Sequence, residues 1–176
     1  VGKHFPGHGG IHADTHLSYS EDLRSLDDLK QHDLIPFHEL HNRLGGIMTA
    51  HISFPEIDNN IATFSQYWLQ NTLREKMKFK GEIFSDDLSM KGTDFIGGID
   101  YKVQKALESG CTMILICNDR PAALQALRFM EKQSTSQSTT LTSLKASKIV
   151  SWEKLEKDPR RKEIINQIHN LGLAIA

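Results

Sequence analysis

The most constraining feature of the sequence is the continuous apolar run Thr112-Met-Ile-Leu-Ile-Cys117. A strand that carries apolar side chains at successive positions is buried on both faces, which is typical of parallel sheets covered by helices. Further strands are predicted over residues 1–5, 46–51 and 81–85, and helical patterns separate them. This strand–helix alternation predicts an α/β fold built from four parallel βα units.

The predicted helices share an apolar stripe at helical spacing and cover residues 26–43, 65–77, 101–109, 122–130 and 159–171. Trp68 and Trp152 lie on these patterns and are predicted to be core or helix-face residues. We expect a domain over residues 1–132, with a long polar loop at 6–20. A Ser/Thr-rich linker at 133–150 and a C-terminal helical segment at 151–176 are expected to follow.

Composition excludes several classes of partner. The chain has 176 residues, 21 Lys and Arg, 22 Asp and Glu, and a net charge of −1. This balance gives no electrostatic reason to expect nucleic acid or an anionic membrane surface as a partner. No apolar run approaches the length that spans a membrane. The two cysteines, Cys111 and Cys117, fit a reducing compartment better than a disulfide scaffold.

Polar side chains lie at the carboxyl end of each of the four predicted strands, where parallel βα folds bind their ligands. These residues are His4, His51, the pair Asp86 and Asp87, and the pair Asn118 and Asp119. A polar residue ends most strands, so one position alone carries little weight. Four such ends together with a specialised loop favour a site at this rim.

Asp86 is the strongest single candidate for chemistry. A carboxylate held rigidly at the end of a buried strand can attack an anomeric carbon and form a covalent glycosyl intermediate. Asp87 competes with it, because only one of two adjacent carboxylates can be aimed at a given point. The alternative interpretation is that either residue caps the turn around Leu88–Met90.

The loop after the first strand carries His8, His12 and His16, with Asp14 two residues before His16. A carboxylate can orient an imidazole, which could then protonate a leaving oxygen and later deprotonate water. The glycines at positions 7, 9 and 10 are interpreted as hinges of a mobile loop. Two alternatives stay open: a solvated loop without a role, and a zinc site, since this spacing also suits metal ligands.

The run Lys-His-Phe-Pro-Gly-His-Gly at residues 3–9, the Asp-x-His pair and Phe84-Ser-Asp-Asp-Leu-Ser-Met90 resemble family 3 glycoside hydrolases, in particular bacterial cytosolic β-N-acetylglucosaminidases. By position, the resemblance implies that Asp86 is the nucleophile, His16 the acid/base and Asp14 its dyad partner. It implies that Lys3 and His4 bind sugar hydroxyls. It implies neither a metal nor a cofactor.

The resemblance further implies a cytoplasmic enzyme of peptidoglycan recycling that hydrolyses, with retention, terminal β-linked N-acetylglucosamine from N-acetylglucosaminyl-anhydro-muropeptides. A complete (β/α)8 TIM barrel needs about 250 residues. We therefore expect the C-terminal half of such a barrel, with the missing N-terminal half as its partner. The alternatives are a glycoside phosphorylase of the same family, a non-catalytic half-barrel that works only by association, and a His-ligated metallohydrolase.

Overall fold

The computed structural model describes residues 1–11, 19–133, 141, 144–146 and 148–171. The chain divides into two compact units, residues 1–143 and 144–176. The predicted linker at 133–150 spans this boundary, and much of it lies outside the described residues. Each unit is described by itself.

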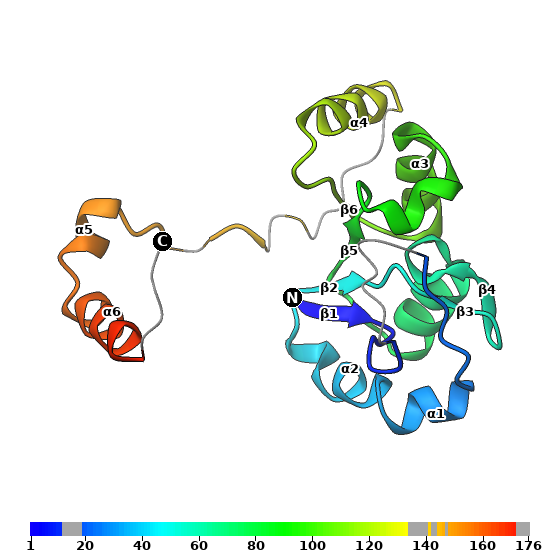
Figure 1. Cartoon of the computed structure of the whole chain (residues 1–176), viewed down its shortest axis with the longest axis horizontal. Coiled ribbons are helices and arrows are strands. Elements are labelled where there is room, and N and C mark those ends of the chain that lie inside the picture. Colours follow the sequence, from blue (N-terminus) through cyan, green and yellow to red (C-terminus); the bar gives the residue numbers. More distant parts are fainter. Residues whose placement is uncertain (12–18, 134–140, 142–143, 147, 172–176) are drawn as a thin grey trace. The chain divides into compact units, whose positions relative to one another are not determined.

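The first unit is built on a parallel sheet of four strands in the order β1-β2-β5-β6 (Figure 1). The strands are β1 (Gly2–Phe5), β2 (Gly46–Thr49), β5 (Glu82–Asp87) and β6 (Met113–Leu115). Each strand pairs with the preceding parallel strand, so the order never reverses along the chain. Such an unreversed parallel sheet is the geometry of a (β/α) barrel and confirms the predicted α/β fold. All four carboxyl ends therefore share one edge.

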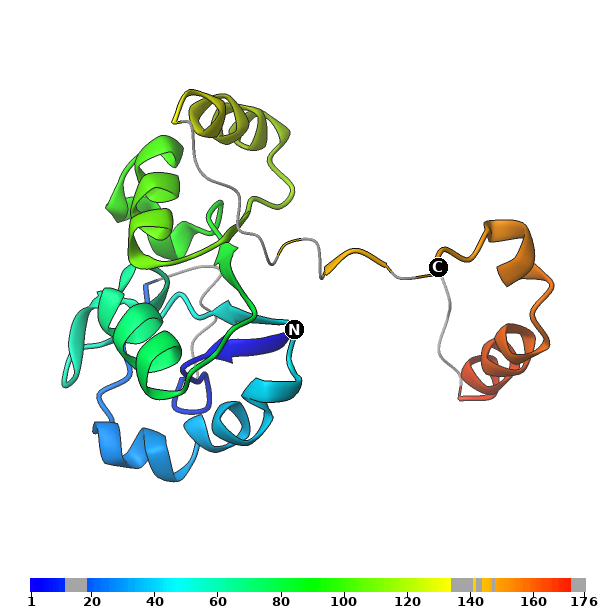
Figure 2. The same ribbon diagram turned by 180° about the vertical axis from the view of Figure 1, so that it is seen from behind.

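Helical segments connect these strands, and α4 follows the last of them. They are α1 (Leu26–Gln31), α2 (Leu34–Leu40), η1 (His41–Arg43), η2 (Ala62–Phe64), η3 (Tyr67–Lys76), η4 (Lys91–Ile96), α3 (Ile99–Ser109) and α4 (Arg120–Lys132). Figures 1 and 2 show α1 and α2 on the side of β1 and β2, and α3 and α4 toward the end of the sheet formed by β6. The pattern places the helices in the crossovers, as a parallel sheet requires.

The prediction of a single helix over residues 26–43 is wrong, because the helix is interrupted between α1 and α2. Ser25 caps α1 by accepting a hydrogen bond from the Asp28 N–H (3.2 Å), and the Asp28 carboxylate accepts one from the Ser25 N–H (3.2 Å). Pro36 explains the break. It has no N–H, and its ring would clash with the carbonyl of His32 in a continuous helix.

Between β2 and η3 the chain forms an unpredicted antiparallel hairpin of β3 (Ser53–Phe54) and β4 (Asp58–Ile61). The helix predicted from Ser65 to Met77 exists, and the Ser65 hydroxyl accepts a hydrogen bond from the Trp68 N–H (3.1 Å). Its turns are wider than expected, since the Met77 N–H bonds to the Thr72 carbonyl, five residues back (2.9 Å).

The core lies between the sheet and its helices. Trp68 is fully buried, as predicted, and makes edge contacts with Phe5 (6.1 Å between ring centroids) and Phe54 (5.3 Å). Ile47 and Ile83 on the two central strands are also fully buried. Aromatic pairs in this geometry contribute about 0.5–1.5 kcal/mol beyond the burial of their area.

The apolar run that predicted a doubly covered strand is less buried than expected. All three residues of β6 are only half-buried. The physical reason is that β6 pairs with β5 alone within the part of the chain that the structure describes. In a closed barrel, a further strand would pair with β6, and side chains across the barrel would cover its inner face.

The second unit contains α5 (Trp152–Glu156) and α6 (Pro159–Asn170). Asp158 caps α6 by accepting from the Arg160 N–H (2.9 Å), and Pro159 occupies the first turn, as predicted. Trp152 lies on an exposed helix face and donates its indole N–H to Glu156 (2.8 Å). Within the described parts of both units, no helix is long and apolar enough to cross a membrane.

Candidate functional site

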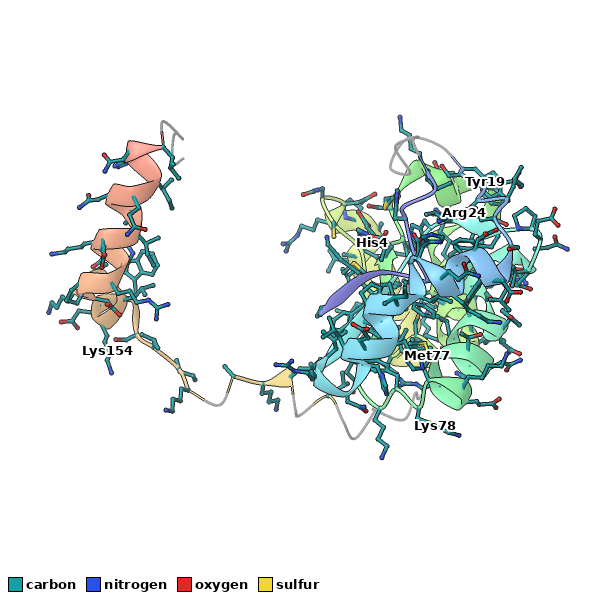
Figure 3. The ribbon with its side chains drawn as sticks, turned by 90° about the horizontal axis from the view of Figure 1, so that it is seen from below. His4, Tyr19, Arg24, Met77, Lys78 and Lys154 are labelled. Atoms are coloured by element: carbon teal, nitrogen blue, oxygen red, sulfur yellow. The ribbon has the colours of Figure 1, made fainter. Side chains whose placement is uncertain are left out.

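The carboxyl ends of β1 and β5 bring His4 and Asp86 together, although β2 lies between the two strands. The Nε2 atom of His4 lies 4.0 Å from Oδ2 of Asp86. Both side chains keep access to solvent, with 28% of the His4 side chain and 15% of the Asp86 side chain exposed. Figure 3 labels His4 among the side chains of the first unit. Lys3, the other predicted sugar-binding residue, is exposed beside it in the chain.

The structure separates the two adjacent carboxylates by their partners. Oδ1 of Asp87 accepts three hydrogen bonds, from the Ser89 N–H (2.9 Å), the Ser89 hydroxyl (2.6 Å) and the Cys117 N–H (3.0 Å). This pattern closes the turn after β5 and ties it to the end of β6. The capping role that the sequence left open for both residues therefore falls to Asp87.

Asp86 is held differently. Its Oδ1 accepts the N–H of Asp87 (2.9 Å), while its Oδ2 is the atom that faces His4. Its own N–H donates to the hydroxyl of Thr49 on the neighbouring strand (3.2 Å). One carboxylate oxygen is thus fixed by the backbone and the other is directed to the rim, which suits a positioned nucleophile.

His51 was expected to present a polar group at the rim, and the structure corrects this expectation. Its side chain is buried, with 1% of the residue exposed. The imidazole contacts the Thr63 hydroxyl through Nδ1 (2.9 Å) and the Asp87 carbonyl through Nε2 (3.0 Å). Burial lowers the pKa of His51, and the negative charges of Asp86 and Asp87 oppose that effect only in part.

The end of β6 also differs from the expectation. Asp119 caps α4 by accepting from the Ala122 N–H (2.9 Å), so its carboxylate serves the helix. Asn118 adopts a positive φ of 56° in the turn before it. These two residues thus have a local structural explanation.

The predicted acid/base pair lies outside the described residues. Asp14, His16 and His12 belong to the range 12–18, for which the structure gives no placement. His8, from the same predicted loop, is placed, and its ring lies 5.8 Å from that of His4, centroid to centroid. Among the described residues no group of three or more His, Cys, Asp or Glu side chains could hold a metal ion.

A charge cluster that the sequence did not reveal anchors both ends of that loop. Asp33 accepts hydrogen bonds from the Gly9 N–H (2.8 Å), near the start of the loop, and from Nη1 of Arg24 (2.6 Å), after its end. Arg24, labelled in Figure 3, also pairs with Asp22, its Nη2 lying 2.7 Å from Oδ2. Burial would raise the pKa of Asp33, but the hydrogen bonds from Arg24 and Gly9 outweigh it and lower that pKa.

The loop glycines have a packing role that their interpretation as hinges did not include. A Cβ atom on Gly7 would collide with the side chain of Asp33. On Gly10 it would come within 2.5 Å of both Nε of Arg24 and Oδ2 of Asp22. These positions need glycine because the backbone closely approaches the charge cluster. Only the pattern of glycines before an Asp-x-Arg segment hinted at this in the sequence.

Comparison with known proteins identifies relatives along most of the chain. Residues 1–147 match the N-terminal domain of glycosyl hydrolase family 3. A protein named beta-hexosaminidase from Idiomarina loihiensis is 45% identical over 164 residues, which cover 91% of this chain and 49% of that protein. Another beta-hexosaminidase, from Pseudomonas aeruginosa, is 46% identical over 132 residues, covering 75% of this chain and 40% of that protein.

A solved structure gives the same result. The crystal structure of native NagZ from Neisseria gonorrhoeae superposes with a TM-score of 0.77 at 32% identity, covering 98% of this chain and 50% of that one. The chain thus spans about half the length of these relatives. The matched region of the family is its N-terminal domain, so our description of the chain as a C-terminal half is corrected: it is an N-terminal region of the family.

Proposed function

Because the chain belongs to glycosyl hydrolase family 3, we propose that it carries the catalytic residues of a β-N-acetylglucosaminidase. The observation that supports this most is the arrangement at the ends of β1 and β5. There the Asp86 carboxylate presents one oxygen to His4 at the rim, while Asp87 is committed to its turn. The relatives named beta-hexosaminidase support the substrate class, a terminal β-linked N-acetylhexosamine.

In the proposed reaction the Asp86 carboxylate attacks the anomeric carbon of the sugar and the bond to the leaving oxygen breaks. His16, oriented by Asp14, donates a proton to that oxygen. It then removes a proton from the water that releases the sugar from Asp86. Two displacements at one carbon retain the β configuration. Lys3 and His4 hold the sugar hydroxyls, and no metal or cofactor is required.

The proposed natural substrate is an N-acetylglucosaminyl-anhydro-muropeptide, which would place the protein in the recycling of cell-wall fragments in the cytoplasm. The free thiols of Cys111 and Cys117 are consistent with a reducing compartment. The half-buried strand β6 supports a requirement for the rest of the barrel. We call the chain together with that complementary portion, taken from a full-length relative where necessary, the assembled enzyme.

The test compares the chain alone with the assembled enzyme on an aryl β-N-acetylglucosaminide. We expect the assembled enzyme to release the β anomer, which proton NMR detects. The chain alone should show little or no turnover. Light scattering should show that the chain alone self-associates, since an open apolar sheet face favours association. Release of the α anomer, or turnover only with added phosphate, would contradict the proposal of retaining hydrolysis.

A further inference from the structure

Three buried side chains form a hydrogen-bonded chain that begins and ends on the backbone of the two adjacent aspartates. The Asp86 N–H donates to the Thr49 hydroxyl (3.2 Å), and the Thr49 and Thr63 hydroxyl oxygens lie 2.7 Å apart. The Thr63 hydroxyl lies 2.9 Å from Nδ1 of His51. Nε2 of His51 lies 3.0 Å from the carbonyl oxygen of Asp87.

When His51 is neutral, the available protons fix the direction of every bond in this chain. A carbonyl oxygen only accepts, so Nε2 of His51 carries the proton that points to Asp87. In a neutral imidazole, Nδ1 then has no proton and accepts from the Thr63 hydroxyl. Thr63 has no second proton, so Thr49 donates to Thr63 and is free to accept from Asp86.

A second arrangement is available to the same atoms. The Thr63 hydroxyl oxygen also lies 3.1 Å from the carbonyl oxygen of Ala50. If His51 carried protons on both nitrogens, Thr63 would accept from Nδ1 and turn its proton to Ala50. The two arrangements differ in the charge of a side chain that is 1% exposed and stacks on Phe64 (6.1 Å between centroids). Burial favours the neutral one.

We propose that Thr49, Thr63 and His51 are positioning residues that hold the backbone of Asp86 and Asp87, and with it the Asp86 carboxylate, in the geometry required for attack on the sugar. None of the three needs to contact the substrate. The chain of bonds connects β2, the segment at η2 and the end of β5, so it fixes Asp86 relative to two other elements. The inference rests on the proposed role of Asp86.

The first test reads the hydrogen-bond directions without any assay of activity. In the assembled enzyme with ¹⁵N-labelled histidines in this chain, long-range proton–nitrogen correlation NMR distinguishes the two neutral tautomers and the imidazolium. The His51→Gln variant assigns the signal by its disappearance. At neutral pH we expect His51 to be neutral with its proton on Nε2. A proton on Nδ1, alone or in an imidazolium, would overturn the proposal.

The second test uses variants that change one hydroxyl and little else. Thr63→Val keeps the shape and removes the donor, whereas Thr63→Ser keeps the donor. In the assembled enzyme, Thr63→Val should lower kcat by ~10- to 100-fold with little change in KM, because a small displacement of a reacting group has an effect of about that size. Thr63→Ser should recover most of this loss.

Thr72→Val is the matched control, because Thr72 is also buried but its hydroxyl has no hydrogen-bond partner among the described residues. We expect its kcat to be unchanged. Equal kcat for Thr63→Val and wild type would overturn the positioning role. Activity retained by Asp86→Ala would contradict the proposed function. The measurement of the His51 tautomer does not depend on that result.

Discussion

The Nε2 atom of His51 donates to the backbone carbonyl of Asp87 across a distance of 3.0 Å, although 36 positions separate the two residues in the chain. This bond requires a proton on Nε2. It also places a buried imidazole against the backbone at the carboxyl end of β5, next to Asp86. Because the ring is enclosed, its protonation state affects the stability of the fold as well as the position of Asp86.

We expect stability to fall as the pH is lowered through the range in which an unfolded histidine titrates, near 6.5. Burial lowers the pKa of His51 in the folded protein, and the positive charge of Lys102 lowers it further. The negative charges of Asp86 and Asp87 raise it, but only in part. The unfolded state therefore takes up the proton first, and stability decreases from about pH 6.5 down to the folded pKa, by at most about 1.4 kcal/mol per pH unit. Above that range this contribution is fully present.

Urea unfolding between pH 5 and pH 8 measures this slope. The His51→Leu variant is the comparison, because it removes the titrating group and leaves the other histidines in place. Its slope should be smaller than that of the wild type. Parallel slopes for the two proteins would show that His51 does not contribute.

The second prediction concerns the charge cluster that anchors the loop ends. Arg24→Met should lower the free energy of unfolding by about 2 kcal/mol, because the side chain of Asp22 is only 2% exposed and would lose its partner. Arg24→Lys should lose less stability, since lysine keeps the positive charge but lacks the planar guanidinium group that bonds to both aspartates. Chemical denaturation of the assembled enzyme measures both.

The control for this prediction is Lys30→Met. Lys30 pairs with Asp27 at 3.0 Å, but the two side chains are 57% and 80% exposed. Its removal should change stability by less than about 0.5 kcal/mol. A cost for Arg24→Met no larger than that for Lys30→Met would show that the cluster does not hold the loop ends.

The third prediction separates the two aspartates by stability. Asp87→Ala removes the acceptor of three hydrogen bonds from Ser89 and Cys117 and should lower the free energy of unfolding by about 1–3 kcal/mol. Asp87→Asn keeps an acceptor oxygen at that place and should cost less. Thermal melts would reveal the difference, and identical melting temperatures for all three proteins would argue against the capping role.

The fourth prediction concerns the proposed acid/base. His16→Ala should slow the hydrolysis of substrates with poor leaving groups most, because those need protonation. Activated aryl glycosides should lose less in the first chemical step, and Asp14→Ala should behave as a weaker version of His16→Ala. A Brønsted plot of kcat/KM against leaving-group pKa makes the comparison. Equal losses for all leaving groups would indicate a binding or structural role.

The sequence predicted the sheet well because its signals are local. The apolar run at 112–117 and the strands before it are short, and the helical patterns that alternate with them favour parallel strands. The break before Pro36 was predictable in principle, since proline cannot occupy the middle of a helix. The hairpin of β3 and β4 was not, because Ser53 and Phe54 form too short a strand to leave a pattern.

The candidate site was predicted in part for a related reason. Strand ends and adjacent acidic residues are visible in the sequence, so Asp86 and His4 were named as candidates, and the structure places them 4.0 Å apart. The choice between Asp86 and Asp87 needed the contacts of Ser89 and Cys117, and the latter lies 30 positions away. Thr49 could have been suspected, since it shares a strand face with His51. Nothing local to Thr63 indicated its partners.

The most direct test of the central claim, that Asp86 is the nucleophile, is covalent labelling of the assembled enzyme. A mechanism-based fluorosugar should trap the glycosyl intermediate, and mass spectrometry of the digested protein locates it. We predict the label on Asp86, with no label in Asp86→Ala and normal labelling of the same peptide in Asp87→Asn. A label on Asp87, or on any residue other than Asp86, would contradict the account.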